Sequence, residues 1–375
     1  MLVRKVAPAA AALVLIAAGA YWMFQRPSAT PRSDGPIVLI SIDTLRADRL
    51  PVYGNTRIKT PHIDRLASDG LVFDNAYAHS PQTLPSHTSI LSGDLPFTHG
   101  VRDNIGFAVR AGQRFLQHTL KERGFATGGF VSSYVLRKQV GFGGGFDVYD
   151  DQLPPVSPDQ PIGQVQRRGE DTVARAVAWL DSQGSRQFFL FTHIYEPHTP
   201  YAPPDRFASQ DPYDGEVAYS DEIIGKLLDH LREKDLYDDA TIVLLSDHGE
   251  GLGDHGESEH GLFLYRETIR VPLIVKLPGS RGGGRRVAAP VQHVDVVPTI
   301  LELTGGGEVS GLPNPASTAV PGRSLLAVLD GDAALPAARI YSESLSPRFH
   351  YGWSALYALS DERYRYIRAP RDELY

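Results

Sequence analysis

Short, continuous hydrophobic runs alternate along the chain with longer segments of helical periodicity. The clearest runs, rich in β-branched and aromatic side chains, lie at residues 37–42, 188–191, 241–245 and 272–275. Runs without polar alternation are typical of parallel strands that are covered on both faces. Residues 171–181 and 221–233 have apolar positions at helical spacing. The pattern predicts an α/β fold, a doubly wound and mostly parallel sheet flanked by helices.

The N-terminal segment differs from the rest of the chain. Arg4 and Lys5 precede an apolar run over residues 6–24. This arrangement is typical of a secretory signal peptide, and the run is also nearly long enough to anchor the chain in a membrane. We expect residues 1–26 to be a signal peptide or signal anchor and residues 27–36 a linker. The remaining chain is then exported, to the periplasm or outside the cell, and could stay anchored to the inner membrane.

Composition narrows the chemistry further. The 375 residues have a net charge of −7 and include no cysteine. Disulfides, thiolate metal sites and a cysteine nucleophile are therefore excluded. Basic residues are scattered along the chain, so we expect no nucleic-acid partner, and membrane contact only through the N-terminal segment.

Metal-ligating residue types follow the predicted strands at their carboxyl ends. Asp43 follows the first run, His193 the second, and Asp247 with His248 the third. Ligands of open α/β sheets bind beyond this edge. Carboxylate and imidazole together suit Zn²⁺ or Mn²⁺, and the carboxylates would also serve Ca²⁺. A lone aspartate at a strand end is more often a helix cap, so the prediction of a metal site depends on the three segments meeting.

A second candidate lies in residues 83–93 (TLPSHTSILSG). Pro85 suits the first turn of a helix, where its missing N–H costs nothing. Thr83 is then expected just ahead of the helix N-terminus, where free amides and the helix dipole favour an anion. A hydroxyl placed there beside a divalent metal is suited to attack an ester. The alternative is that Thr83 only caps the helix.

These segments, taken in order, resemble the sulfatase family of the alkaline-phosphatase superfamily. The matching stretches are residues 40–54 (ISIDTLRADRLPVYG), 60–67 (TPHIDRLA), 83–93, 196–201 (EPHTPY), 246–257 (SDHGEGLGDHGE), 265–275 (YRETIRVPLIV) and 293–305 (HVDVVPTILELTG). The resemblance implies a sulfatase-like catalytic domain over residues 37–310. It also implies a small C-terminal subdomain over residues 311–375, which is expected to be incomplete.

The resemblance also assigns roles to particular residues. Asp43, Asp247 and His248 match the family's metal ligands, and Thr83 matches its nucleophile. It implies one divalent metal (Zn, Mn or Ca), held by these four residues.

Five further polar residues are expected to meet the substrate. His198 matches a histidine that contacts the ester oxyanion or the leaving group, with a loop turn as the alternative. His260 falls where typical sulfatases place a substrate-contacting lysine, and we expect it to act as a general acid; the alternative is a surface histidine. His87, Asn104 and His193 are expected to bind substrate, although Asn104 is equally well explained by a turn.

Two departures from the family pattern change the expected chemistry. Formylglycine forms from a Cys or Ser followed by Pro and Arg two and four residues later, whereas this chain has Thr83, Pro85 and His87. Threonine cannot become the aldehyde, so no formylglycine is possible. Thr44 also replaces the second aspartate of the usual pair, which implies a single metal.

Members with a threonine nucleophile are phosphotransferases and phosphodiesterases. We therefore predict a metal-dependent hydrolase of sulfate or phosphate esters, with phosphoesters favoured. Its substrate is expected to be a small-molecule, glycan or lipid ester. The alternative is a catalytically silent, sulfatase-like binding protein.

Overall fold

A computed structural model describes residues 35–155, 165–184, 186–208, 211–305, 321–329, 331 and 335–375, which belong to one unit. The predicted signal or anchor over residues 1–26 lies outside them. Among the described residues, no helix is both long enough and apolar enough to cross a bilayer.

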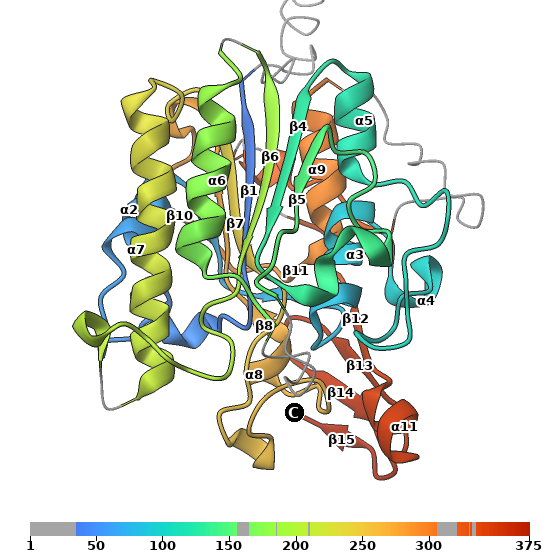
Figure 1. The fold of residues 1–375 in the computed structure, drawn as a ribbon. Coiled ribbons are helices and arrows are strands. Elements are labelled where there is room, and N and C mark those ends of the chain that lie inside the picture. Colours follow the sequence, from blue (N-terminus) through green and yellow to red (C-terminus); the bar gives the residue numbers. More distant parts are fainter. Residues whose placement is uncertain are drawn as a thin grey trace, which may run out of the picture. The chain divides into compact units, whose positions relative to one another are not determined.

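An eight-stranded sheet forms the centre of the fold, with strand order β10-β2-β9-β7-β1-β6-β4-β5 (Figure 1). Its strands are β1 (Ile37–Ile42), β2 (Leu71–Phe73), β4 (Ala126–Val131), β5 (Val148–Asp150), β6 (Phe188–Ile194), β7 (Thr241–Ser246), β9 (Leu273–Lys276) and β10 (Arg285–Val287). β1 pairs in parallel with both β6 and β7, whereas β9 runs antiparallel to β7 and β2. The predicted mostly parallel sheet is thus confirmed.

The central strands are mostly apolar because both faces of the sheet are covered. Every residue of β1, β6 and β7 is buried. Successive residues of β1 point to opposite faces, so Ile37 and Leu39 belong to one hydrophobic cluster and Val38 and Ile40 to the other. This two-sided burial is the physical reason for the continuous hydrophobic runs in the sequence.

Helices form the outer layers on the two faces of the sheet (Figure 1). α2, α6 and α7 contribute to one hydrophobic cluster, and α3, α5 and α9 to the other. The helices are α2 (Pro61–Asp69), α3 (Thr83–Ser92), α4 (Pro96–His99), α5 (Leu116–Glu122), α6 (Gly169–Asp181), α7 (Pro212–Glu233), α8 (Arg266–Ile269), α9 (Val296–Leu303), α10 (Leu326–Leu329) and α11 (Ser346–Tyr351). α7 begins nine residues before the expected residue 221, because Asp211 caps it by accepting from the backbone N–H of Tyr213 and Pro212 occupies its first position.

Two smaller sheets complete the described part of the chain. β3 (Ala76–Tyr77), β8 (Arg270–Val271) and β11 (Val291–Gln292) form the first. The second is an antiparallel sheet of β12 (Ile340–Ser344), β13 (Leu356–Ser360), β14 (Arg365–Arg368) and β15 (Glu373–Leu374). This second sheet is the small C-terminal subdomain expected from the sequence.

Candidate active site

Three adjacent strands bring the predicted ligands together. β1 lies between β6 and β7, with Ser41 in register with His193 on one side and Leu245 on the other. Asp43 directly follows β1, and Asp247 directly follows β7. The carboxyl ends of the three strands therefore meet at one edge of the sheet, as the sequence predicts.

Asp43, Asp247 and His248 form a buried group that fits a divalent cation. Each offers a ligand atom, and these atoms lie within 4.8 Å of one another. His248 Nε2 is 3.7 Å from Asp43 Oδ1 and 3.4 Å from Asp247 Oδ2. Ligands held at about 2.1 Å from one ion are themselves separated by about 3 to 3.5 Å. Neither of these carboxylate oxygens has a hydrogen-bond partner among the described residues, so both are free to bind a cation.

The electrostatics of this group favour a cation as well. Burial raises the pKa of Asp43 to about 7, and the charge of Glu250 acts in the same direction. Burial and the neighbouring Asp43 carboxylate raise the pKa of Asp247. Two buried carboxylates side by side are unfavourable unless a positive charge lies between them.

Thr83 lies beside this group, at the N-terminus of α3. The helix begins at Thr83 itself rather than just after it, and Gln82 is the N-cap residue. Thr83 Oγ1 is 3.3 Å from His248 Nε2. The backbone N–H of Leu84 donates to Asn104 Oδ1 at 2.8 Å. Asn104 therefore contacts the first turn of the helix that carries Thr83.

His87 and His193 are fully buried next to the Asp247 and Asp43 carboxylates. His87 Nε2 is 2.8 Å from Ser41 Oγ, and its Nδ1 is 2.8 Å from the carbonyl oxygen of Thr83. His193 Nε2 is 3.2 Å from Asp43 Oδ2. His87, His193 and Asp247 also offer ligand atoms within 4.8 Å, but both nitrogens of His87 are already bonded. The observed contacts of these two histidines are with residues of the site, which they orient.

His198 and His260 lie on the more open side of the group. The His260 ring centroid is 4.5 Å from that of His248 and 4.9 Å from that of His198. His198 is 9% exposed and the His260 side chain 11%, whereas the His248 side chain is fully buried. His198 Nδ1 is 2.6 Å from the Thr199 carbonyl oxygen, and its ring stacks on Tyr195. Both histidines are thus placed where a substrate could reach them.

Glu250 is a buried partner of His260 that the sequence analysis did not identify. Its Oε1 is 3.0 Å from His260 Nδ1, and its Oε2 accepts from the Tyr201 hydroxyl at 2.9 Å. Burial alone would lower the pKa of His260, but the charge of Glu250, reinforced by Asp43 and Asp247, raises it to about 9. The position of Glu250, two residues after the candidate metal ligand His248, was the available signal.

We expect Glu250→Gln to lower kcat by about 10- to 100-fold while leaving metal content unchanged. The carboxylate keeps a proton on His260 Nδ1, and an amide holds it less firmly in that tautomer. Steady-state kinetics and metal analysis on the same preparation test this. Glu259→Gln, a change at the exposed acidic residue beside His260, is the matched control. Wild-type kcat in Glu250→Gln would contradict the assignment.

Two further buried carboxylates hold the segment that carries His198. Glu196 accepts from the backbone N–H of Gly169 with both oxygens, at 3.2 and 3.0 Å. Glu216 on α7 accepts from the backbone N–H of Ala202 at 3.0 Å. Burial, followed by the charge of Glu196, raises the pKa of Glu216 to about 7.

This raised pKa predicts a pH-dependent stability. Between about pH 4.5 and 7 the folded protein binds more protons at Glu216 than the unfolded chain does. The stability that protonated Glu216 contributes to the fold is therefore lost as the pH rises through 7. Glu216→Gln, which can keep the bond to Ala202, should be more stable than the wild type at pH 8, by up to about 3 kcal/mol. The difference should vanish near pH 4.

Urea unfolding of both proteins at the two pH values measures this. Glu222→Gln on the same helix is the control, because Arg206 lowers the pKa of Glu222 and no gain at pH 8 is expected there. A stability difference that is the same at both pH values would contradict the assignment.

Comparison with known proteins identifies the family of this chain. The sulfatase family model matches residues 36–306. The ulvan-active sulfatase of Formosa agariphila is 26% identical in an alignment that covers 72% of this chain and 61% of that protein. The present chain therefore spans less than two thirds of that relative's length. The multifunctional alkaline phosphatase superfamily protein PehA of Trinickia caryophylli is 25% identical in an alignment that covers 78% of this chain and 76% of PehA.

Solved structures agree on the fold. One of them, in complex with its substrate D-glucosamine-2-N,6-O-disulfate, has a TM-score of 0.75 at 20% identity, covering 91% of this chain and 90% of that chain. The phosphonate monoester hydrolase of Agrobacterium radiobacter has a TM-score of 0.74 at 19% identity, covering 91% and 89%. The family model covers more than half of the chain, and the chain therefore belongs to the sulfatase family of the alkaline-phosphatase superfamily.

Proposed function

We propose that this chain is a metal-dependent hydrolase of sulfate or phosphate esters in which Thr83 is the nucleophile. The observation that carries the proposal is the 3.3 Å separation between Thr83 Oγ1 and His248 Nε2, inside the buried group of Asp43, Asp247 and His248. The hydroxyl also lies at the N-terminus of α3, where the helix dipole favours an anionic ester.

One divalent cation (Zn²⁺, Mn²⁺ or Ca²⁺) would be held by Asp43, Asp247 and His248, with Thr83 as the fourth ligand. When bound, it would lower the pKa of the threonine hydroxyl and offset negative charge on the ester oxygens. His87 and His193 orient the group from behind through their contacts with Ser41 and Asp43. Formylglycine has no part in this scheme, because the chain has threonine at the nucleophile position.

The reaction follows from the placement of these side chains. Thr83 gives up its hydroxyl proton to water, Thr83 Oγ bonds to the phosphorus or sulfur, and the bond from that atom to the leaving oxygen breaks in line. His260 donates a proton to the leaving oxygen, since the charge of Glu250 raises the pKa of His260 to about 9. Water then attacks the threonyl ester at the same centre and releases Thr83.

Phosphoesters are the favoured substrates. A threonyl intermediate can be released only by attack at the phosphorus or sulfur, a step that suits a phosphoryl group better than a sulfuryl group. Relatives and structural neighbours include enzymes named for sulfates and an enzyme named for phosphonate monoesters, so both chemistries are accessible to this fold. The substrate is a small-molecule, glycan or lipid ester, met after export through the N-terminal segment.

The test is ester turnover by the full chain, with metal analysis on the same preparation. Aryl sulfate, phosphate monoester and phosphodiester substrates are compared, with Zn²⁺, Mn²⁺ or Ca²⁺ supplied after chelation. Metal-dependent turnover with a phosphoester preference is expected. Stoichiometric metal without turnover of any ester would favour the silent binding protein instead.

A further inference from the structure

A pocket of about 390 Å³ lies between the C-terminal sheet and two segments of the sulfatase-like domain. One segment includes β3, and the other includes the residues that follow His260. None of the candidate catalytic or metal-binding residues lines this hollow, which we call the Arg365 pocket. Six of its lining residues provide its positive charge, a free hydroxyl group and two aromatic rings: Tyr77, His255, Arg266, Ser360, Arg363 and Arg365.

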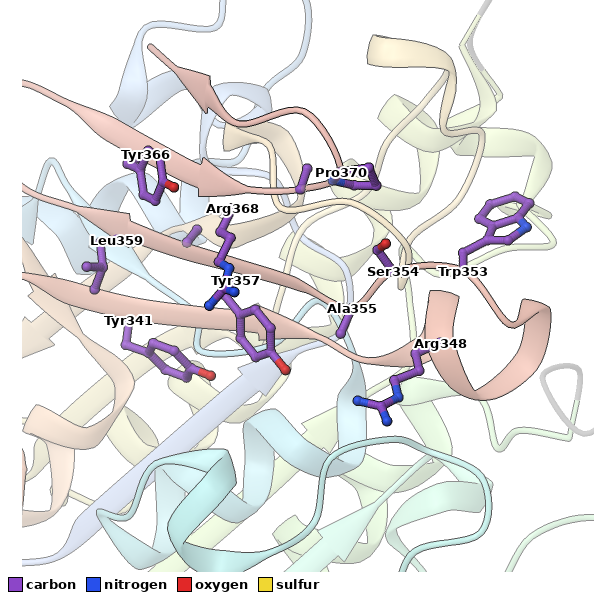
Figure 2. Close-up of a pocket in the computed structure, with 12 residues that line it drawn as sticks. Tyr341, Arg348, Trp353, Ser354, Ala355, Tyr357, Leu359, Tyr366, Arg368 and Pro370 are labelled. Carbon is purple, nitrogen blue, oxygen red and sulfur yellow. The ribbon is translucent and has the colours of Figure 1, made fainter.

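Two of these residues are neighbours across the C-terminal sheet. Ser360 on β13 pairs in register with Arg365 on β14, and both are buried. Leu359 and Tyr366, which adjoin them in sequence, lie on the outer face of the sheet (Figure 2) and are 46% and 39% exposed. Side chains alternate between the two faces of a strand. The Ser360 hydroxyl and the Arg365 guanidinium group therefore lie together on the inner face, in the wall of the pocket that both line.

The buried guanidinium group of Arg365 forms no ion pair with any carboxylate that the structure describes. Its Nη1 donates to the Leu264 carbonyl oxygen at 3.3 Å, and its central carbon lies 5.0 Å from the centre of the Tyr77 ring. Burial lowers the pKa of Arg365, and the charge of Arg266 acts in the same direction, whereas Tyr77 and Glu267 offset this shift only in part. A buried charge is unfavourable without a partner. Negative charge is therefore what this pocket lacks.

Further hydrogen-bond donors line the pocket. Arg266 and Arg363 are exposed, and neither forms an ion pair within the described part of the chain. Ser360 Oγ is buried and has no hydrogen-bond partner among the described residues. Each guanidinium group carries five N–H donors. The pocket therefore has more N–H and O–H donors than its own acceptors use.

The carboxylates in or beside the lining do not cancel this charge. Asp361 accepts from two backbone N–H groups of its own turn, both at 2.8 Å. Outside the lining, Glu267 lies 2.6 Å from His255 Nδ1, and Glu373 accepts from two tyrosine hydroxyls. Glu362 lines the pocket and is exposed to water. Three arginines against the two lining carboxylates leave the pocket with a net positive charge.

We propose that the Arg365 pocket binds a small ligand through a phosphate or sulfate group. Guanidinium groups recognise such oxyanions through paired N–H donors, and the Ser360 hydroxyl can supply one more. The Tyr77 ring and the His255 ring, which stacks on Tyr265 at 3.9 Å, form less polar parts of the wall, where a charge interaction is stronger than in water. The volume is near the lower end for ligand sites, which suits the free anion or a small monoester.

A ligand in the Arg365 pocket would connect the C-terminal sheet to the loop that ends beside His260. The backbone N–H of Gly251 donates to the Glu259 carbonyl oxygen at 2.6 Å, so the segment between them folds back on itself. His255 lies in this segment and lines the pocket, whereas Glu250 and His260 flank its base. A bound oxyanion would therefore hold this loop against the sheet. Binding itself does not rest on the proposed function, because no candidate catalytic residue lines the pocket.

The test is isothermal titration calorimetry of the full chain in chelator, with inorganic phosphate, inorganic sulfate and phenyl phosphate as ligands. Without metal, the buried carboxylates of the candidate active site oppose an anion there. We expect one saturable site per chain. Arg365→Gln and the exposed pair Arg266→Gln/Arg363→Gln should each weaken binding by at least about tenfold. Arg368→Gln/Arg371→Gln, which removes two exposed charges outside the pocket, should bind as the wild type does.

Three results would overturn the proposal: no saturable binding, an equal loss in the control pair, or unchanged binding in Arg266→Gln/Arg363→Gln. The exposed pair decides the question even if Arg365→Gln fails to fold. Thr83→Ala should bind as the wild type does, and a site lost in Thr83→Ala would contradict the proposal by placing the anion in the active site. Phenyl phosphate separates the two sources of the oxyanion: tighter binding than phosphate identifies a monoester, and weaker binding the free anion.

Discussion

Thr83→Ala is expected to lower kcat/KM for every ester that the protein hydrolyses by about 10³-fold or more. The hydroxyl forms the covalent bond in the proposed reaction, and a methyl group cannot replace it. Metal binding should weaken by no more than about tenfold, because two carboxylates and an imidazole remain as ligands. Kinetics and metal analysis on one preparation separate the two effects.

Thr83→Ser is the matched variant, since it keeps the hydroxyl and removes one methyl group. We expect it to retain activity within about tenfold of the wild type. If both variants were inactive, a packing role for the methyl group would explain the result. If both were active, Thr83 would be a helix-terminal residue without a part in the chemistry.

Asp247→Asn is expected to abolish stoichiometric metal binding and, with it, turnover. The amide oxygen can keep the contacts of Oδ1 with the backbone N–H groups of Thr44 and His248, at 3.3 and 2.9 Å, so the loop should hold its shape. The amide nitrogen replaces Oδ2, the oxygen without a partner among the described residues. Metal affinity should fall by on the order of 10²-fold or more.

We also expect the stability difference between Asp247→Asn and the wild type to change sign when metal is added. In chelator, Asp247→Asn should melt at least about 2 °C above the wild type, because one of two buried carboxylates that repel each other has become neutral. With metal supplied, the wild type should be the more stable protein, since only it binds the cation. Glu216→Gln neutralises a buried carboxylate elsewhere and should keep its metal. A variant less stable than the wild type in chelator would contradict a metal-binding role for this carboxylate pair.

The strands that are buried on both faces of the sheet were predictable from the sequence. The runs that became β1, β6 and β7 are almost continuously apolar, and the residues at their ends therefore identified one edge of the sheet. The antiparallel direction of β9 was not predictable, because a hydrophobic run looks the same in either direction. The C-terminal strands are short, and three of the outward positions of β13 and β14 are Tyr357, Leu359 and Tyr366 rather than polar residues, which conceals the alternation.

The grouping of Asp43, Asp247 and His248 was predictable because each of these residues directly follows a strand or lies in a conspicuous motif. The buried residues that hold the site in place were not predictable. Glu250 and Glu196 act through partners brought close by tertiary structure, His260 and the backbone of Gly169, and no spacing in the sequence announces such a pair. The burial of His87 was equally hidden, because its position on α3 gives no indication that its nitrogens meet Ser41 and the Thr83 carbonyl group.

The central claim, covalent catalysis by Thr83, is tested most directly by trapping the intermediate. The full chain is mixed with its best phosphoester, quenched in acid within milliseconds, digested and analysed by mass spectrometry. The account predicts a phosphoryl group on the peptide that contains Thr83, absent when metal is removed and absent in Thr83→Ala. Full turnover in Thr83→Ala, or a covalent adduct on any other residue, would contradict it.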